Sequence, residues 1–319
     1  MAITPTDYIW MNGELVPWAD AKVHVLSHAL HYGTAVFEGI RSYETPWGAR
    51  LFRLGDHIDR LYHSGRVYGI DLPYSRDELH AASRRVVAEN GLTSAYIRPI
   101  AYKGYGGIGL LGRASPVEVS IAAFPWGAYL GETGQKEGID VCVSSWQRAA
   151  PNTVPAGLKA AGNYLSSLLI SREAHERGFA EGIGLSVDGL VSEGAGENLF
   201  LVKKGRLITP PAAASILAGI TRDTVMTLAQ SLGIELVEQP IPREMLYLAD
   251  EIFLTGTAAE VTPVRSVDRL AVGSGERPVT TAIQDAFFGL FDGRTADRWG
   301  WLEPLEGEAV PLPTRTAAG

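Results

Sequence analysis

The chain has 319 residues, of which 46% are hydrophobic and 20% charged, as in water-soluble globular proteins of about two domains. Its formal net charge of −8 disfavours binding to nucleic acid or to an anionic membrane. No apolar run approaches the ~20 residues of a membrane-spanning helix, and the first residues lack the pattern of a signal peptide. We therefore expect a cytoplasmic protein. The single cysteine, Cys142, is expected to lie in a strand and to pack in the hydrophobic core.

The first half of the chain mixes short strand patterns with two helical patterns. Asn12-Gly13 predicts a hairpin turn, and Ser75 followed by Glu78 predicts a capped helix start. Residues 23–33 favour strand and loop over helix. In chain order we expect strands at 8–11, 14–17 and 36–43, helices at 56–68 and 75–90, and strands at 96–102 and 117–124. The sequence thus predicts a small α/β domain over residues 1–124.

Residues 125–134 lack periodicity and contain Pro and Gly, which predicts an interdomain linker. A large α/β domain is expected over 135–302. Its elements are expected to be a strand at 139–146, a helix at 163–177, hairpins at 183–193 and 198–209, a helix at 221–232, strands at 234–240, 251–255 and 261–267, and a helix at 279–291. The Pro- and Ala-rich residues 303–319 predict a disordered tail.

One of the six lysines has an unusual setting. Lys159 lies in the string PAGLKAAG, whose small residues offer it no partner charge. An amine there can be partly desolvated, which favours its neutral, nucleophilic form. A neutral amine attacking an aldehyde forms a Schiff base, and the usual aldehyde partner in proteins is pyridoxal phosphate. The alternative interpretation is a surface lysine entering a helix.

Two turns could bind the phosphate of such a cofactor. Residues 217–222 (LAGITR) run into a helix N-terminus, where backbone N–H groups and the helix dipole attract an anion. Residues 253–259 (FLTGTAA) end a strand in small residues with further donors. Arg60 could add a positive charge, although an ordinary ion pair with Asp56 is the alternative. Each turn taken alone also fits a helix start without function.

A carboxylate in residues 192–200 (SEGAGENLF) could bind the pyridine nitrogen of the cofactor. The neighbouring glycines let the backbone approach a flat ring. A carboxylate at the nitrogen keeps it protonated, so that the ring can accept an electron pair from the substrate α-carbon. We choose Glu193 over Glu197, because Glu193 ends a hairpin strand whereas Glu197 begins the next. A polar hairpin connection is the alternative.

Seven strings, in the same order, resemble those of the branched-chain amino acid aminotransferases, pyridoxal phosphate enzymes of the D-amino-acid-aminotransferase-like fold (fold type IV). The strings are HALHYGTAVFEGIR, SAYIRP, AAFPWGAYLG, LKAAGNYLSSL, SEGAGENLF, AGITRD and GTAAEVTPV. The resemblance covers about residues 7–302. It implies a two-domain α/β fold, pyridoxal 5'-phosphate as cofactor, and a ping-pong transfer of the amino group of leucine, isoleucine or valine to 2-oxoglutarate.

The resemblance also implies roles for individual residues. Lys159 would form the Schiff base and move the proton, Glu193 would bind the pyridine nitrogen, and Tyr164 would bind the phenolic oxygen. The phosphate would be bound by Arg60, Ile220, Thr221 and Thr257, next to Leu217, Gly219 and Gly256. The substrate would lie among Tyr32, Phe37, Gly39, Arg41, Tyr96, Arg98, Trp126, Tyr129 and Ala258.

Arg98 is implied to bind the distal carboxylate of glutamate. Burying this carboxylate without a partner in an apolar pocket would cost several kcal/mol of binding free energy. An arginine at the rim of the pocket would supply that partner. Arg41 could assist it, or could form a salt bridge at a strand edge. In the family, loops of a neighbouring subunit complete the pocket, which implies at least a homodimer, with residues 103–112 (KGYGGIGLLG) as such a loop.

Three other interpretations are weighed against this one. His24, His28 and His31 have the spacing of a helical metal site, but no carboxylate joins them and their surroundings favour strand and loop. The same fold also carries aminodeoxychorismate lyases, D-amino acid aminotransferases and amine transaminases. The strings YIRP (96–99) and GTAA (256–259) favour the branched-chain type. A non-catalytic binding protein on this fold would be expected to lack Lys159 or Glu193, and both are present.

Overall fold

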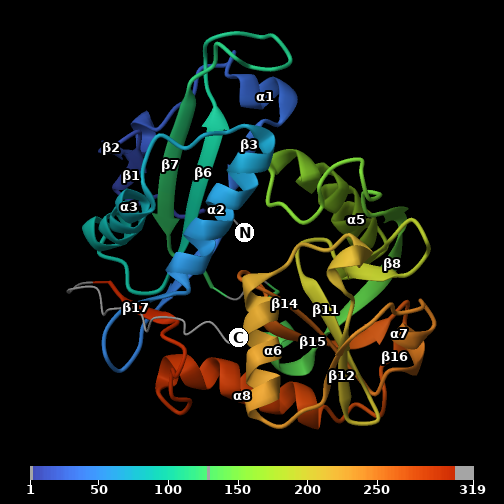
Figure 1. The fold of residues 1–319 in the computed structure, drawn as a ribbon. Helices are drawn as coiled ribbons and strands as arrows, with labels where there is room; N and C mark the ends of the chain where they lie inside the picture. The colour runs from blue at the N-terminus through green and yellow to red at the C-terminus, as the bar shows by residue number, and fades with distance from the viewer. Residues whose placement is uncertain (1–2, 128–129, 306–319) are drawn as a thin grey trace, which may run out of the picture. The chain divides into compact units, whose positions relative to one another are not determined.

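The computed structural model describes residues 3–127 and 130–305, which form two compact units (Figure 1). Among the described residues, the first unit comprises residues 3–126 and 289–305, whereas the second comprises residues 127 and 130–288. The large domain was predicted to extend over residues 135–302. The structure differs because the returning chain adds a strand to the first unit's sheet.

The strands of the first unit form one antiparallel sheet in the order β17-β5-β4-β6-β7-β1-β2, with β3 beside β6. Their bounds are β1 (Tyr8–Met11), β2 (Glu14–Pro17), β3 (Ala35–Phe37), β4 (Ile40–Tyr43), β5 (Arg50–Phe52), β6 (Ala95–Lys103), β7 (Val117–Phe124) and β17 (Leu302–Pro304). The predicted hairpin turn is confirmed, since Asn12 and Gly13 both have positive φ between β1 and β2.

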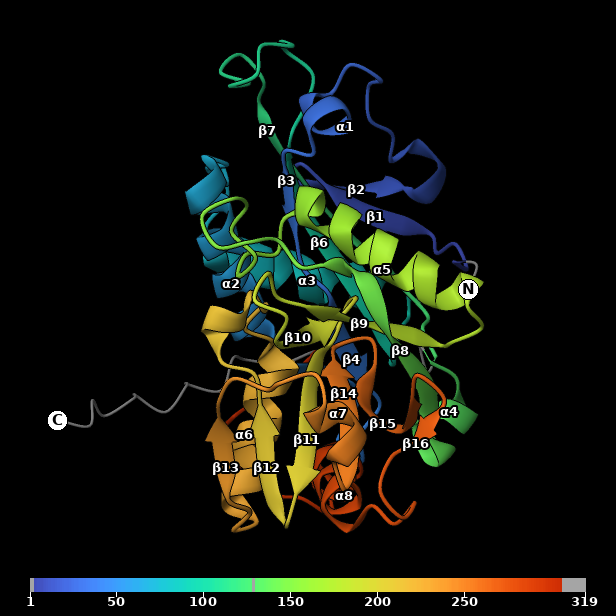
Figure 2. The same ribbon diagram turned by 90° about the vertical axis from the view of Figure 1, so that its right-hand side faces the viewer.

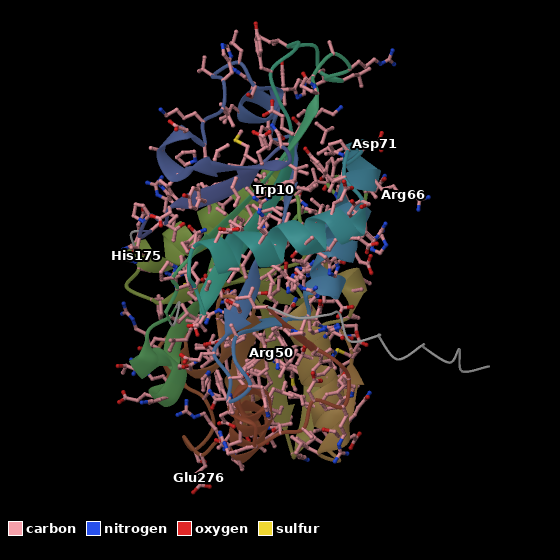
Figure 3. All side chains as sticks on the ribbon, turned by 90° about the vertical axis from the view of Figure 1, so that its left-hand side faces the viewer. Trp10, Arg50, Arg66, Asp71, His175 and Glu276 are labelled. Carbon is pink, nitrogen blue, oxygen red and sulfur yellow. The ribbon has the colours of Figure 1, made fainter. Side chains whose placement is uncertain are left out.

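Helices α2 (Leu54–Tyr68) and α3 (Arg76–Glu89) pack against this sheet, and Figure 1 shows α2 in front of it. Ser75 and Glu78 form the predicted capping box at the start of α3. Trp10 on β1 lies inside the unit, 5.0 Å from the ring of Tyr74, while Arg66 points outward from α2 (Figure 3). The apolar side chains between helices and sheet therefore form this unit's core.

The second unit is built on a mixed sheet in the order β10-β9-β8-β15-β14-β11-β12-β13, with β16 beside β15. The bounds are β8 (Ile139–Gln147), β9 (Glu181–Leu185), β10 (Val191–Gly194), β11 (Asn198–Lys203), β12 (Arg206–Thr209), β13 (Leu236–Glu238), β14 (Glu251–Gly256), β15 (Glu260–Val267) and β16 (Leu270–Ala271). Figure 2 shows β13, β12, β11 and β14 next to one another. The pairs β8–β9, β8–β15 and β12–β13 are parallel, and the others are antiparallel.

Among the described residues, four α-helices belong wholly to the second unit, and a fifth begins in it. They are α4 (Glu132–Glu137), α5 (Tyr164–Glu176), α6 (Ile220–Ser231), α7 (Met245–Leu248) and α8 (Pro278–Asp292). Helix α5 packs on β8 and β9, and α6 packs on β13 and β14. Cys142 is buried in β8, as predicted. The mixed α/β fold predicted from the sequence is thus confirmed, and no described helix is long and apolar enough to cross a membrane.

Several local predictions were wrong. The strand expected at 36–43 is interrupted after Phe37, because Pro99 on the partner strand has no N–H to return the hydrogen bond that Glu38 donates to it. Helix α1 (His28–Tyr32) replaces the expected strand and loop, and it ends at Gly33 in a left-handed conformation. Of the expected disordered tail, residues 303 and 304 lie in β17, and residues 306–319 lie outside the described part of the chain.

Candidate active site

Lys159 and Tyr164 meet in the second unit. Lys159 is half-buried, just before a short 3-10 helix (Ala161–Asn163) that leads into α5. The amide of Asn163 donates to the carbonyls of Pro155 and Leu158, at 3.0 and 3.1 Å, and so holds the segment that carries the lysine. Lys159 Nζ donates to Tyr164 Oη at 2.6 Å. The structure therefore brings together two residues that were predicted to share one cofactor.

Glu193 lies on β10 and is buried, with donors on both carboxylate oxygens. Arg148 approaches Oε1 at 2.5 Å. Asn198 Nδ2 and the backbone N–H of Leu217 donate to Oε2, at 2.9 and 3.0 Å. Burial raises the pKa of Glu193 to about 7, although Arg148 opposes this shift. The carboxylate is therefore fixed in one orientation, and its charge is sensitive to its neighbours.

Asn198 ties this carboxylate to the first predicted phosphate turn. Its Nδ2 donates to the carbonyl of Leu217 at 2.8 Å as well as to Glu193. A Cβ on Gly219 would lie 2.0 Å from Asn198 Oδ1, so only glycine fits there. Helix α6 starts at the next residue, Ile220, and both Ile220 and Thr221 are buried in its first turn. The N–H groups of a first helical turn have no partner within their helix, which suits them to an anion.

The second predicted phosphate turn joins β14 to β15. Thr257 and Ala258 are half-buried in this turn. It is closed by hydrogen bonds from Thr255 Oγ1 to the carbonyl of Glu260 and from Thr262 Oγ1 to that of Ala259, at 2.6 and 2.7 Å. A Cβ on Gly256 would lie 3.5 Å from the carbonyl oxygen of Gly196, so the turn lies against the SEGAGENLF string.

Two further glutamates are buried near Glu193. Glu181 begins β9, and Glu197 immediately precedes β11. Burial raises the pKa of both carboxyl groups, and their mutual repulsion raises that of Glu181 further. We therefore expect this pair to keep a proton in the apo-protein where an exposed glutamate would be ionised. Glu193 is distinguished from Glu197 by its contact with Arg148 and with the turn at Leu217.

A second cluster, in the first unit, combines an arginine with apolar and aromatic side chains. Arg98 on β6 donates to Tyr96 Oη at 3.0 Å, and its guanidinium carbon lies 4.8 Å from the centre of the Phe37 ring. Arg98 Nε is buried without a hydrogen-bond partner among the described residues. A Cβ on Gly39 would overlap Tyr96 Oη, and Trp126 lies 5.2 Å from the Tyr96 ring. This arrangement suits a ligand with an apolar part and a negative charge.

Arg60 on α2 is held by a buried carboxylate. Its Nε and one terminal nitrogen donate to the two oxygens of Glu38, at 2.7 and 2.8 Å, and His57 Nδ1 lies 2.7 Å from Glu38 Oε2. Burial raises the pKa of Glu38, but Arg60 and His57 outweigh it and hold the pKa well below its usual range. Asp56, the alternative partner considered for Arg60, pairs with Arg53 at 2.7 Å.

The remaining predicted site residues lie in different settings. Tyr32 is exposed on α1, and its hydroxyl donates to the carbonyl of Ile108 in the loop 103–112. Arg41 is buried on β4, which lies between β5 and β6 in the sheet. Tyr129 lies outside the described residues.

The three histidines considered as metal ligands have other contacts. His28 bonds to Thr34 Oγ1 and to the carbonyl of Gly109, at 2.8 and 2.9 Å. His31 Nε2 lies 3.0 Å from the carbonyl of Val25, and His24 Nδ1 accepts from the N–H of Leu26 at 3.1 Å. Residues 3–127 and 130–305 contain no group of His, Cys, Asp or Glu side chains that could hold a metal ion.

The residues that hold the predicted ones in place were not predicted from the sequence. They are Glu38 and His57 beside Arg60, and Arg148 and Asn198 beside Glu193. Asn198 left a usable signal, because the amide of an Asn beside a glycine-rich turn has two donor hydrogens and can bond to two acceptors, here Glu193 Oε2 and the carbonyl of Leu217. No pattern in the sequence indicated Arg148, because its partner Glu193 lies far along the chain, on β10.

Comparisons with known proteins agree over nearly the whole chain. The family model described as amino-transferase class IV matches residues 35–267. The branched-chain-amino-acid aminotransferase of Escherichia coli (strain K12) is 58% identical over 307 residues, which cover 96% of this chain and 99% of that protein. The crystal structure of the Escherichia coli enzyme matches with a TM-score of 0.93 at 57% identity, covering 95% of this chain and 100% of the other. The branched-chain amino acid aminotransferase of Thermobaculum terrenum, solved in its PLP-form (holo-form), matches with a TM-score of 0.88 at 36% identity, covering 95% and 99%.

Proposed function

The chain belongs to the class IV aminotransferases and within them to the branched-chain-amino-acid aminotransferases of fold type IV, and from this premise we propose the details of its site and reaction. It binds pyridoxal 5'-phosphate and transfers the amino group of leucine, isoleucine or valine to 2-oxoglutarate. The observation that carries the proposal is the 2.6 Å contact of Lys159 Nζ with Tyr164 Oη, in the same unit as the buried Glu193.

The residues of the second unit fit such a cofactor. When bound, pyridoxal phosphate supplies an aldehyde that takes up the amino group and a ring that accepts electrons. Lys159 provides the amine that binds the aldehyde and carries the proton to and from the substrate α-carbon, while Tyr164 orients that amine. Glu193 binds the ring nitrogen, and the first turn of α6 binds the phosphate.

The other phosphate ligands remain part of the proposal. Thr257 offers a hydroxyl and a backbone N–H in the turn between β14 and β15. Arg60 adds a positive charge, and Glu38 fixes the direction of its guanidinium by two hydrogen bonds. Because this bidentate pair already orders the side chain of Arg60, binding of the phosphate costs less conformational entropy.

Arg98 distinguishes the two substrates. Replacing it by Ala is expected to slow the half-reaction with 2-oxoglutarate roughly 100-fold more than that with leucine, because only 2-oxoglutarate brings a second carboxylate into the apolar cluster. Single-turnover rates, read from the cofactor spectrum, measure each half-reaction separately. Arg66→Ala, at an exposed arginine of the same unit, is the matched control. Equal losses in both half-reactions would show that Arg98 has another task.

The functional unit is proposed to be a homodimer, and the loop 103–112 supports it. Leu110 and Leu111 are 77% and 65% exposed in the single chain, and Tyr32 is bonded to the same loop. We expect light scattering to give twice the mass of one chain. We also expect Leu110→Asp with Leu111→Asp to yield monomers of low activity. A wild-type monomer with full activity would contradict this expectation.

The reaction is tested by incubating the purified protein and pyridoxal 5'-phosphate with each branched-chain amino acid and 2-oxoglutarate. We expect L-glutamate and the matching 2-oxo acid in equal amounts. D-amino acids, and aminodeoxychorismate with release of pyruvate, are the contrasting substrates. A preference for either of these would overturn the substrate assignment while leaving the family intact.

A further inference from the structure

The buried carboxylate of Glu193 has one acceptor position left by the described residues. A carboxylate oxygen accepts about two hydrogen bonds. Oε2 already accepts two, from Asn198 Nδ2 at 2.9 Å and from the N–H of Leu217 at 3.0 Å. Oε1 is approached by Arg148, at 2.5 Å. If Glu193 binds the ring nitrogen, the acceptor position for it is therefore on the oxygen that Arg148 holds.

We propose that Arg148 is a positioning residue, which presents Oε1 of Glu193 to the ring nitrogen and keeps that carboxylate ionised. The inference rests on the proposed function, since it requires that Glu193 meets the ring of pyridoxal phosphate. Arg148 acts through Glu193 and itself stays away from the substrate and from the reacting atoms.

The setting of Arg148 shows that this side chain is built into the unit. It follows β8 directly and is buried, as is Glu193. One terminal nitrogen donates to Ser167 Oγ on α5 at 3.2 Å, and the other meets Glu193. A Cβ on Gly184 would lie 3.1 Å from Arg148 Cγ, so the glycine leaves room for the arginine stem. Nε has no partner among the described residues, so the arginine gives up one hydrogen bond while it makes the other two.

The charges around Glu193 explain why an arginine is needed. Arg148 is the cation in direct contact, Lys159 lowers the pKa of Glu193 from further away, and Glu197 raises it. Burial alone favours the neutral acid, which already holds a proton and could not keep the ring nitrogen protonated. Arg148 opposes this preference, because its contacts hold a positively charged guanidinium group beside the carboxylate.

The test compares Arg148→Met and Arg148→Lys with the wild-type holoenzyme. We expect Arg148→Met to weaken binding of pyridoxal 5'-phosphate to the apo-protein and to lower kcat, each by roughly 10- to 100-fold, as for the supporting partners of bound metals. Arg148→Lys should recover part of both losses. The pH at which the bound cofactor changes its absorption should shift in the Met variant, a change that a purely structural role would not produce.

A double-mutant cycle gives the sharpest result. In a Glu193→Gln background, Arg148→Met should change cofactor affinity less than about 3-fold on our account, because the charge it supports is already gone. Equal effects of Arg148→Met in both backgrounds, or an unchanged pH titration, would overturn the proposal. Wild-type protein that fails to bind pyridoxal 5'-phosphate would instead overturn the proposed function. Thermal melting of each variant with and without the cofactor separates loss of folding from loss of positioning.

Discussion

Replacing Lys159 by Ala is expected to lower kcat/KM for leucine by at least about 10⁴-fold, because in the proposed reaction one amine both binds the aldehyde and carries the proton of the transfer. Tyr164 keeps its place at the start of α5 but cannot replace an amine in either task. The cofactor is expected to bind the variant noncovalently, through Glu193 and the first turn of α6. A coupled glutamate assay measures the activity, and borohydride reduction followed by peptide mapping shows whether the cofactor is linked to the chain.

The matched control is Lys203→Ala in the same unit. Lys203 pairs with Asp250 at 2.9 Å near the end of β11, and we assign it no part in the site. Borohydride should fix the cofactor to wild-type protein and to this control, and should fail to fix it to Lys159→Ala. Wild-type turnover by Lys159→Ala in a folded state would refute the assignment.

The elements predicted most closely are those specified by neighbouring residues. The β1–β2 hairpin follows from Asn12-Gly13, and α3 follows from its capping box, since both signals act within a few residues. The break after Phe37 was missed because it depends on Pro99 in a strand that pairs from far along the chain. The strand β17 was missed for the same reason: Leu302 pairs with Phe52.

The candidate site divides in the same way. The meeting of Lys159 and Tyr164 could be expected, because a turn into a helix brings residues five positions apart together. The choice of Glu193 rested on its place at a strand end, and the structure puts it in β10. Its ion pair with Arg148 and the hold of Glu38 on Arg60 both join different elements, so no spacing in the sequence specifies them. The roles of Glu193 and Arg60 were implied by the family resemblance, whereas the contacts that hold these two side chains in place are seen only in the structure.

Glu193→Gln is expected to lower kcat roughly 10²- to 10³-fold with little change in KM for leucine, because a neutral amide keeps the shape of the side chain but cannot hold a proton on the ring nitrogen. The amide oxygen can still accept from Asn198 and Leu217, so the fold around α6 should be kept. Steady-state kinetics with saturating cofactor measure the effect. Asp250→Asn, at a half-exposed carboxylate that pairs with Lys203, is the control of equal charge change.

Stability against pH gives an independent measure of the same carboxylate in the apo-protein. Burial raises the pKa of Glu193 from 4.5 to about 7, so the folded chain keeps a proton there that the unfolded chain releases. The stability linked to this proton is fully present below pH 4.5 and is lost as the pH rises through about 7. The pKa values of Glu181 and Glu197 are raised as well, so these residues change the stability with pH in the same direction. Part of the pH dependence will therefore remain in the Glu193→Gln variant. Between about pH 5 and about pH 8, the free energy of unfolding measured in urea should therefore fall less for Glu193→Gln than for wild type. An unchanged fall together with an unchanged kcat would contradict the assignment of Glu193 to the ring nitrogen.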